Sequence, residues 1–157
     1  MLQTMETEIF SDPFVYVFDG ARAEFPNFAE RKSEIIDGVF TWAKDSVAFA
    51  TTQELGVPVV IQEHSACPAL ELNQWDQVIE VGIELISGEL VVAGMLDYLP
   101  SAARLKVKAG SYRLRIRFGD LDEYWTTGGW FCNAHYQLLI WPSSLEEASV
   151  LKSHSRS

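Results

Sequence analysis

Short apolar runs separated by turn residues make up most of the chain. Aromatic and β-branched residues fill positions 14–18, and Asp19-Gly20 follows them as a turn. Comparable runs over 47–51, 57–61, 78–86, 89–93, 104–108, 111–118 and 135–141 bring the predicted strands to about eight. Many short strands joined by turns are typical of an antiparallel β-sandwich or jelly roll. The pattern therefore predicts an all-β fold.

One segment has helical rather than alternating spacing. Apolar residues recur at helical intervals between Phe28 and Ala43, and the sequence from Asn27 to Glu30 has the form of a capping box. This predicts one short helix near residues 28–42, weakened in its middle by Gly38. The chain shows no repeat and no linker, so we expect a single domain over 1–142, followed by a polar, flexible tail over 143–157.

Composition narrows the classes of function. The 157 residues include 22 acidic and 12 basic side chains, a formal charge of -10, which argues against direct nucleic-acid binding. The first ten residues lack the basic start and apolar run of a secretory signal, and no stretch is long and apolar enough for a membrane helix. Two cysteines are too few for a disulfide framework. We therefore expect a cytoplasmic protein with no membrane partner.

The charge is divided unevenly along the chain. Residues 1–103 carry 17 acidic and four basic side chains, whereas 104–157 carry five acidic and eight basic ones, giving -13 and +3. Six cations alternate with apolar residues on both sides of Ala109-Gly110, which predicts a hairpin with one basic face: Arg104, Lys106, Lys108, Arg113, Arg115 and Arg117. Directly opposed like charges destabilise a sheet. Either Glu80 and Glu84 on a neighbouring strand neutralise this face, or a phosphate or acidic partner does so.

Two mirrored pairs resemble metal ligands. His64 and Cys67 have the spacing His-x-x-Cys, and Cys132 and His135 have the spacing Cys-x-x-His. Together they could supply a Cys₂His₂ zinc set, or Cys132 and His135 a nucleophile and base. The usual zinc spacings differ from these, and nothing nearby would orient the base. The sequence therefore predicts no cofactor and no catalytic residue, with a metal, ligand or enzyme pocket near these four residues as the alternative.

The loop after residue 118 combines carboxylates, aromatic rings and Gly128-Gly129. Such loops on a rigid β-scaffold often bind partners, and the residues suited to gripping a basic protein surface are Asp120, Asp122, Glu123, Tyr124, Trp125 and Trp130. The alternative is that the rings fold back over one end of the sandwich and close its core.

Two patches of the sequence have a distinctive order of residues. They are the segment containing Phe28, Glu34, Gly38, Phe40, Trp42-Ala43 and Val47-Ala48-Phe49, and the later run 109–114, AGSYRL. Both patches resemble the competence protein J family. The resemblance spans about residues 10–118. It implies a non-catalytic β-sandwich protein, since the family's founding role is inhibition of a DNA-entry nuclease through complex formation. The acidic-aromatic loop and the strand 135–141 depart from the family pattern, so the resemblance does not imply the same nuclease.

Together these features predict an acidic binding protein that masks the basic surface of a partner, such as a nuclease. Carboxylates would oppose the partner's Lys and Arg side chains, and aromatic rings would supply the desolvated anchors. The sequence leaves open whether the chain forms an oligomer.

Overall fold

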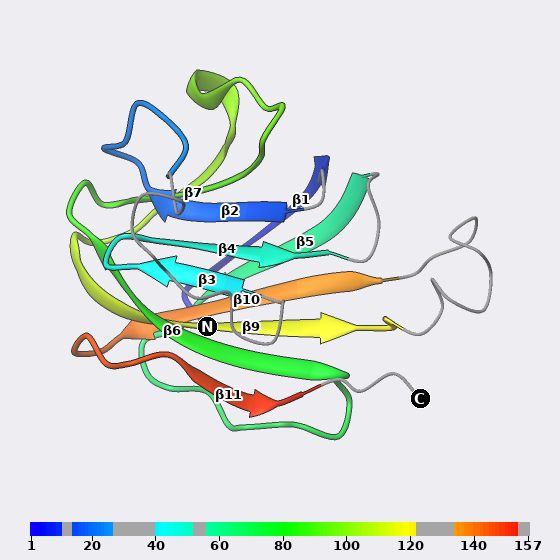
Figure 1. Cartoon of the computed structure of the whole chain (residues 1–157). Helices are drawn as coiled ribbons and strands as arrows, with labels where there is room; N and C mark the ends of the chain where they lie inside the picture. Colours follow the sequence, from blue (N-terminus) through cyan, green and yellow to red (C-terminus); the bar gives the residue numbers. More distant parts are fainter. Residues whose placement is uncertain (11–13, 27–39, 52–55, 122–133, 154–157) are drawn as a thin grey trace.

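Two β-sheets face each other across an apolar interior (Figure 1). The computed structural model describes residues 1–10, 14–26, 40–51, 56–121 and 134–153. The six-stranded sheet has the order β1-β5-β10-β9-β6-β11. Its strands are β1 (Gln3–Phe10), β5 (Gly56–Glu63), β6 (Gln77–Leu85), β9 (Gly110–Gly119), β10 (His135–Pro142) and β11 (Ser149–Lys152).

The five-stranded sheet has the order β3-β4-β2-β7-β8. Its strands are β2 (Phe14–Asp19), β3 (Phe40–Ala43), β4 (Ser46–Ala50), β7 (Glu89–Gly94) and β8 (Ala103–Lys106). A 3-10 turn, η2 (Leu99–Ser101), lies between β7 and β8. Neighbouring strands run antiparallel except β5 and β10, which are parallel. The all-β sandwich is confirmed, and the described residues form eleven strands where the sequence predicted about eight. None of the helices in the described part of the chain is long and apolar enough to cross a membrane.

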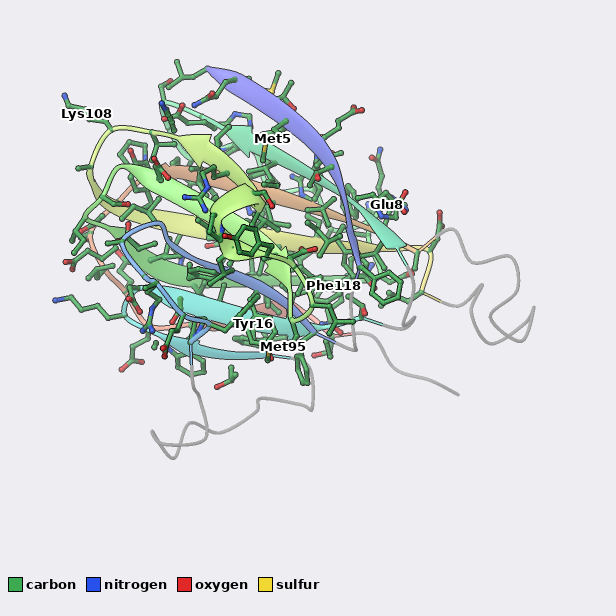
Figure 2. The ribbon with its side chains drawn as sticks, turned by 90° about the horizontal axis from the view of Figure 1, so that it is seen from above. Met5, Glu8, Tyr16, Met95, Lys108 and Phe118 are labelled. Atoms are coloured by element: carbon green, nitrogen blue, oxygen red, sulfur yellow. The ribbon has the colours of Figure 1, made fainter. Side chains whose placement is uncertain are left out.

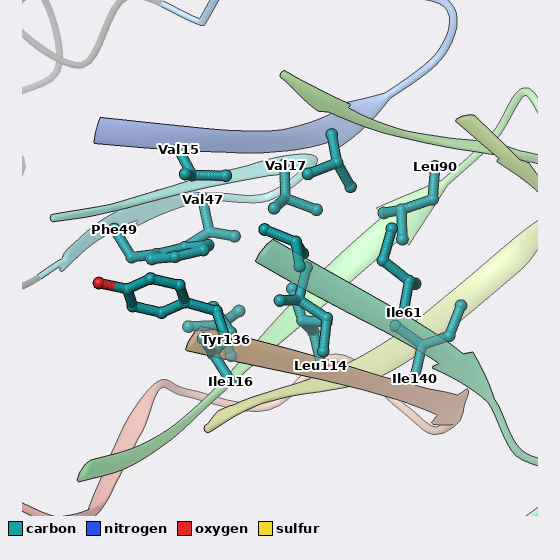
Figure 3. Packing of buried hydrophobic residues seen from close by; sticks show 14 of the residues in the cluster. Val15, Val17, Val47, Phe49, Ile61, Leu90, Leu114, Ile116, Tyr136 and Ile140 are labelled. Atoms are coloured by element: carbon teal, nitrogen blue, oxygen red, sulfur yellow. The ribbon is translucent and has the colours of Figure 1, made fainter. Parts of the chain in front are cut away.

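Alternating side chains of both sheets fill the core (Figure 3). Val15, Val17 and Val47 face Leu114 and Ile116 from the opposite sheet, and all are fully or almost fully buried. At one end, the rings of Phe49, Phe118 and Tyr136 meet with centroids 5.4 to 5.6 Å apart. This alternation explains the strand pattern in the sequence, because every second residue points into the interior.

The turn predicted as a hairpin instead joins the two sheets, and one other turn does the same. The turn at Ser87-Gly88 connects β6 to β7, and the turn at Ala109-Gly110 connects β8 to β9, and in both cases the strands belong to different sheets. The backbone N–H of Val107 donates to the carbonyl of Gly88, so the two crossings lie side by side. The hairpin with one basic face is therefore wrong, because Arg104 and Lys106 lie in one sheet and the β9 arginines in the other.

Two further predictions about secondary structure need correction. The last residues of the predicted helix, Phe40 to Trp42, form β3, which pairs with β4; residues 28–39 lie outside the described residues. The aromatic rings of Phe40 and Trp42 lie on one side of the strand, 5.7 Å apart, so the local period is two. In the predicted flexible tail, Ser149 to Lys152 form β11 on the free side of β6.

Candidate functional site

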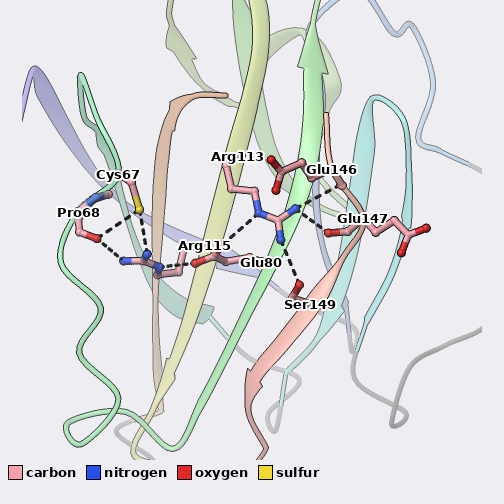
Figure 4. Close-up of polar contacts among 8 residues, drawn as sticks. All are labelled: Cys67, Pro68, Glu80, Arg113, Arg115, Glu146, Glu147 and Ser149. Atoms are coloured by element: carbon pink, nitrogen blue, oxygen red, sulfur yellow. Dashed lines mark hydrogen bonds and ion pairs between the residues drawn. The ribbon is translucent and has the colours of Figure 1, made fainter. Parts of the chain in front are cut away.

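Three arginines on the outer face of β9 are buried rather than exposed. Arg113, Arg115 and Arg117 are 6%, 2% and 7% exposed. Glu80 on β6 accepts from both Arg113 Nε, at 3.1 Å, and Arg115 Nε, at 2.8 Å (Figure 4). The predicted neutralisation by Glu80 is therefore confirmed, whereas Glu84 pairs with Lys44 in the turn between β3 and β4.

The same arginines hold two chain segments against the sheet. Arg115 donates to the carbonyls of Pro68 and Ala69, and Arg113 donates to the carbonyls of Glu146 and Glu147. Arg115 also lies 4.9 Å from the centre of the Trp141 ring. Because these guanidinium groups are occupied within the fold, they offer little charge to an external anion.

Exposed charges of opposite sign lie at the two ends of β9. Lys106 and Lys108 are exposed beside the turn that enters β9, and Asp120 is exposed just beyond the other end of that strand. Ten residues of extended chain place these ends about 30 Å apart. Glu8 lies at the same end as Asp120, and Figure 2 shows it far from Lys108.

We define the acidic end by Glu8, Asp76 and Asp120. In the sheet register, Glu8 on β1 lies opposite Pro58 on β5. The next strand of the sheet is β10, and its residue His135 lies opposite Gly119 on β9. Strands are about 4.8 Å apart, so the three carboxylates lie along one row at the end of the six-stranded sheet. Glu8 and Asp120 are exposed, which leaves both available to a partner.

Local hydrogen bonds fix the start of the acidic-aromatic loop. Asp76 accepts a hydrogen bond from the backbone N–H of Leu121 at 2.8 Å, and Leu121 itself is buried. Asp120 has a positive φ of 54°, which short polar residues adopt more readily than most, and its carboxylate lies 3.6 Å from Nδ1 of His135. The chain therefore leaves β9 in a defined direction.

Stacked side chains support this end from the side. The rings of His135 and Trp75 have centroids 5.4 Å apart, and the Arg117 guanidinium lies 5.5 Å from the Trp75 ring centre. Arg117 also donates to Gln137 at 2.8 Å. Burial, and after it the charge of Arg115, lowers the pKa of Arg117 from its usual value. Because arginine stays protonated in proteins, a cation lies below the acidic row.

The structure describes only part of the predicted binding loop. Of its predicted residues, Asp120 lies at the acidic end, while Asp122, Glu123, Tyr124, Trp125 and Trp130 lie outside the described residues. The sequence analysis did not identify Glu8 or Asp76 as site residues. Period-two alternation of Thr4, Glu6 and Glu8 with Met5, Thr7 and Ile9 was the signal that could have identified β1.

The two histidines of the alternative metal set lie far apart. The backbone of His64 bonds to Ile140 near the end of β10, whereas His135 begins that strand. Five residues of strand separate these positions by about 16 Å, too far for both imidazoles to bind one zinc ion. Cys67 instead lies 3.5 Å from Arg115 Nη2, and Cys132 lies outside the described residues. Elsewhere in the described segments, no three His, Cys, Asp or Glu side chains are grouped as a metal site.

Two solved structures share this fold. One is titled "Crocagin biosynthetic gene J": it has 18% sequence identity and a TM-score of 0.62, and the match covers 90% of this chain and 97% of that one. The other is ComJ of Bacillus subtilis, an inhibitor of the DNA-degrading activity of NucA, with 10% identity, a TM-score of 0.63, and coverage of 90% and 96%.

The structure remotely resembles that of ComJ. At this level of identity the likeness to ComJ establishes the fold and leaves the activity to be argued separately. No family model matches the chain, and no curated protein matches it in sequence.

Proposed function

We propose that this chain is an acidic inhibitor or accessory protein that binds a basic protein, a nuclease or a nuclease-like enzyme, and masks its surface. The fold is shared with ComJ, whose described role is inhibition of a nuclease. Because a fold alone does not fix a function, the proposal depends on how charge is arranged on this chain's own surface.

The distribution of ion pairs is the observation that carries the proposal. Five cations of the described segments are paired with carboxylates of the same chain: Arg22, Lys44, Arg104, Arg113 and Arg115. The exposed carboxylates in those segments are Glu6, Glu8, Glu24, Glu71, Asp120, Glu146 and Glu147. The exposed cations in the same segments are Lys44, Lys106 and Lys108, and Lys44 is paired with Glu84. Exposed carboxylates therefore outnumber exposed cations on the described surface.

Such a surface suits a partner that binds DNA. A nuclease holds phosphates with Lys and Arg side chains, and carboxylates can occupy the same positions. Complementary charge also accelerates association and makes it depend on salt. The acidic end would then cover the partner's phosphate-binding surface, with Asp122, Glu123 and the rings of Tyr124, Trp125 and Trp130 as further proposed contacts.

Affinity capture tests this proposal. The tagged chain is immobilised, and an extract of its native cells is passed over it at about 0.1 M and about 1 M salt, where charges are screened over about 10 and about 3 Å. We expect a basic protein with nuclease activity to be retained at low salt and released at high salt. A Glu6→Gln, Glu8→Gln, Asp120→Asn variant should retain less of it. Retention of no basic protein at either salt concentration would overturn the proposal.

A further inference from the structure

The turn between β7 and β8 exposes three large apolar side chains in a span of four residues. Met95, Leu96 and Tyr98 are 46%, 70% and 73% exposed. Figure 1 shows this connection standing out from the five-stranded sheet. Single exposed apolar residues are common on protein surfaces, but a contiguous group of them marks an interaction site. We call Met95, Leu96 and Tyr98 the apolar turn.

The backbone of the apolar turn is held in place although its side chains are exposed. Asp97 accepts from the N–H of Gly94 at 2.9 Å, and its own N–H donates to the carbonyl of Gly94 at 3.0 Å. The N–H of Ser101 donates to the carbonyl of Tyr98, which closes the following turn. Arg104 donates to the carbonyl of Leu99 from below. The exposed side chains are therefore presented on a preformed backbone, which lowers the entropic cost of binding.

Packed aromatic rings lie beneath the apolar turn. Tyr16 pairs with Ala93, two residues before Met95, and Figure 2 shows Tyr16 and Met95 close together on this face. The ring of Tyr16 packs edge-on against Phe25, with centroids 5.3 Å apart. Leu99, the residue directly after the apolar turn, packs against the same cluster.

The apolar turn is continuous with the strand that carries acidic residues. The end of β1 lies against Gly94, where a Cβ atom would come within 1.8 Å of the Phe10 carbonyl oxygen. Phe10 is 46% exposed, and two residues before it Glu8 faces outward on the same side of β1. Arg104, the cation below the turn, is paired with Glu89 at 3.0 Å. The surface thus presents an apolar centre with carboxylates on one flank.

We infer that the apolar turn is the hydrophobic anchor for the partner named in the proposed function, on which this inference rests. Its occupant is a protein surface with an apolar depression bordered by Lys or Arg side chains. Aromatic residues and Met are enriched in the desolvated centres of interfaces, whereas charges at the rim chiefly set specificity and association rate. The turn supplies the centre, and Glu6 and Glu8 supply the rim.

Site-specific photo-crosslinking tests the inference. The photoreactive residue p-benzoylphenylalanine replaces Tyr98 or, as a matched control, Ile86, which is 67% exposed in the turn between β6 and β7. Each protein is irradiated in native extract, and the crosslinked product is identified by its mass, its charge and its nuclease activity. We expect position 98, and not position 86, to yield a basic protein.

The outcomes separate this inference from the proposed function. A basic nuclease that the unmodified chain captures but that position 98 does not crosslink would overturn the anchor alone. A basic protein without nuclease activity, crosslinked from position 98, would support the anchor and contradict the nuclease assignment. An acidic protein at position 98, or no crosslink and no capture, would overturn the anchor as well.

A binding measurement gives a second, independent result. Leu96→Asp should weaken affinity for the captured basic protein by about tenfold or more, whereas Ile86→Asp should change it less than about twofold. Because both side chains are largely exposed, neither variant should alter the melting temperature. Equal affinities for Leu96→Asp and the unmodified chain would contradict the inference.

Discussion

Replacing Glu80 tests whether one buried carboxylate secures the outer face of the six-stranded sheet. Glu80→Gln keeps the size of the side chain but removes the charge that faces Arg113 and Arg115, whose side chains are 7% and 2% exposed. Loss of one partner of a buried ion pair costs about 3–5 kcal/mol. Both arginines keep carbonyl acceptors, so we expect the lower end of that range, about 3 kcal/mol.

The expected loss is large enough to measure precisely. For a domain of this size, about 3 kcal/mol corresponds to a fall in melting temperature of about 6–12 °C. The free energy of unfolding is measured by urea titration, with the fluorescence of the five tryptophans as the signal. Limited proteolysis supplies a second readout, because both arginines anchor neighbouring segments at Pro68 and Glu146 through their carbonyls.

Glu84→Gln is the matched control on the same strand. Glu84 pairs with Lys44, whose side chain is 69% exposed, so losing this pair should cost less than about 1 kcal/mol. If Glu80→Gln and Glu84→Gln destabilise the protein equally, then the buried arginines do not depend on Glu80. That result would show that burial of the arginines does not raise the cost of losing their carboxylate partner.

Two further predictions concern the fold. Gly94→Ala places a Cβ atom against the Phe10 carbonyl oxygen, so one of the two backbones must shift. We expect the free energy of unfolding, measured with urea, to fall by about 2–3 kcal/mol. An unchanged urea midpoint would contradict the close approach. Burial tends to raise the pKa of Asp45, but the hydrogen bond and the charge of Arg22 outweigh it and lower that pKa below its usual value. The pair, with contacts of 2.8 and 2.9 Å, therefore adds stability above the ordinary carboxyl pKa of about 3.9, and this stability is lost as the pH falls through the folded-state pKa. Because the pair is partly exposed, it should contribute about 1 kcal/mol or less. Arg22→Met should therefore have a lower melting temperature than the unmodified chain at pH 7, and the two melting temperatures should converge near pH 2. A constant difference between them would show that the effect does not come from the Asp45 charge.

Local pattern predicted most strands but not the sheet to which each belongs. A hairpin and a crossing between two sheets have the same local form, strand, turn, strand, with period two on both sides. What distinguishes the Ala109-Gly110 turn is a contact distant in sequence, from Val107 to Gly88. Because such contacts depend on the packing of the whole sandwich, the sequence predicted a hairpin in their place.

The missed and misassigned strands have physical explanations of the same kind. The outward residues of β1 are Thr and Glu, which weaken its apolar signal, and β11 is a short edge strand with an irregular register.

At the site, the requirement that opposed cations be neutralised correctly identified Glu80 as a partner of the β9 arginines. It could not predict their burial, which depends on segments more than 30 residues away in the chain.

If this chain occludes a nuclease, adding it should stop DNA degradation, and a titration measures that effect. The basic nuclease recovered by affinity capture is mixed with increasing amounts of the chain, and cleavage of duplex DNA is followed at about 0.1 M salt, where charged surfaces still interact over about 10 Å. We predict that cleavage falls to background near equimolar chain, and that Leu96→Asp and Glu8→Gln both require more protein for the same inhibition. Full cleavage at a saturating excess of the unmodified chain would contradict the proposal that this chain inhibits a nuclease.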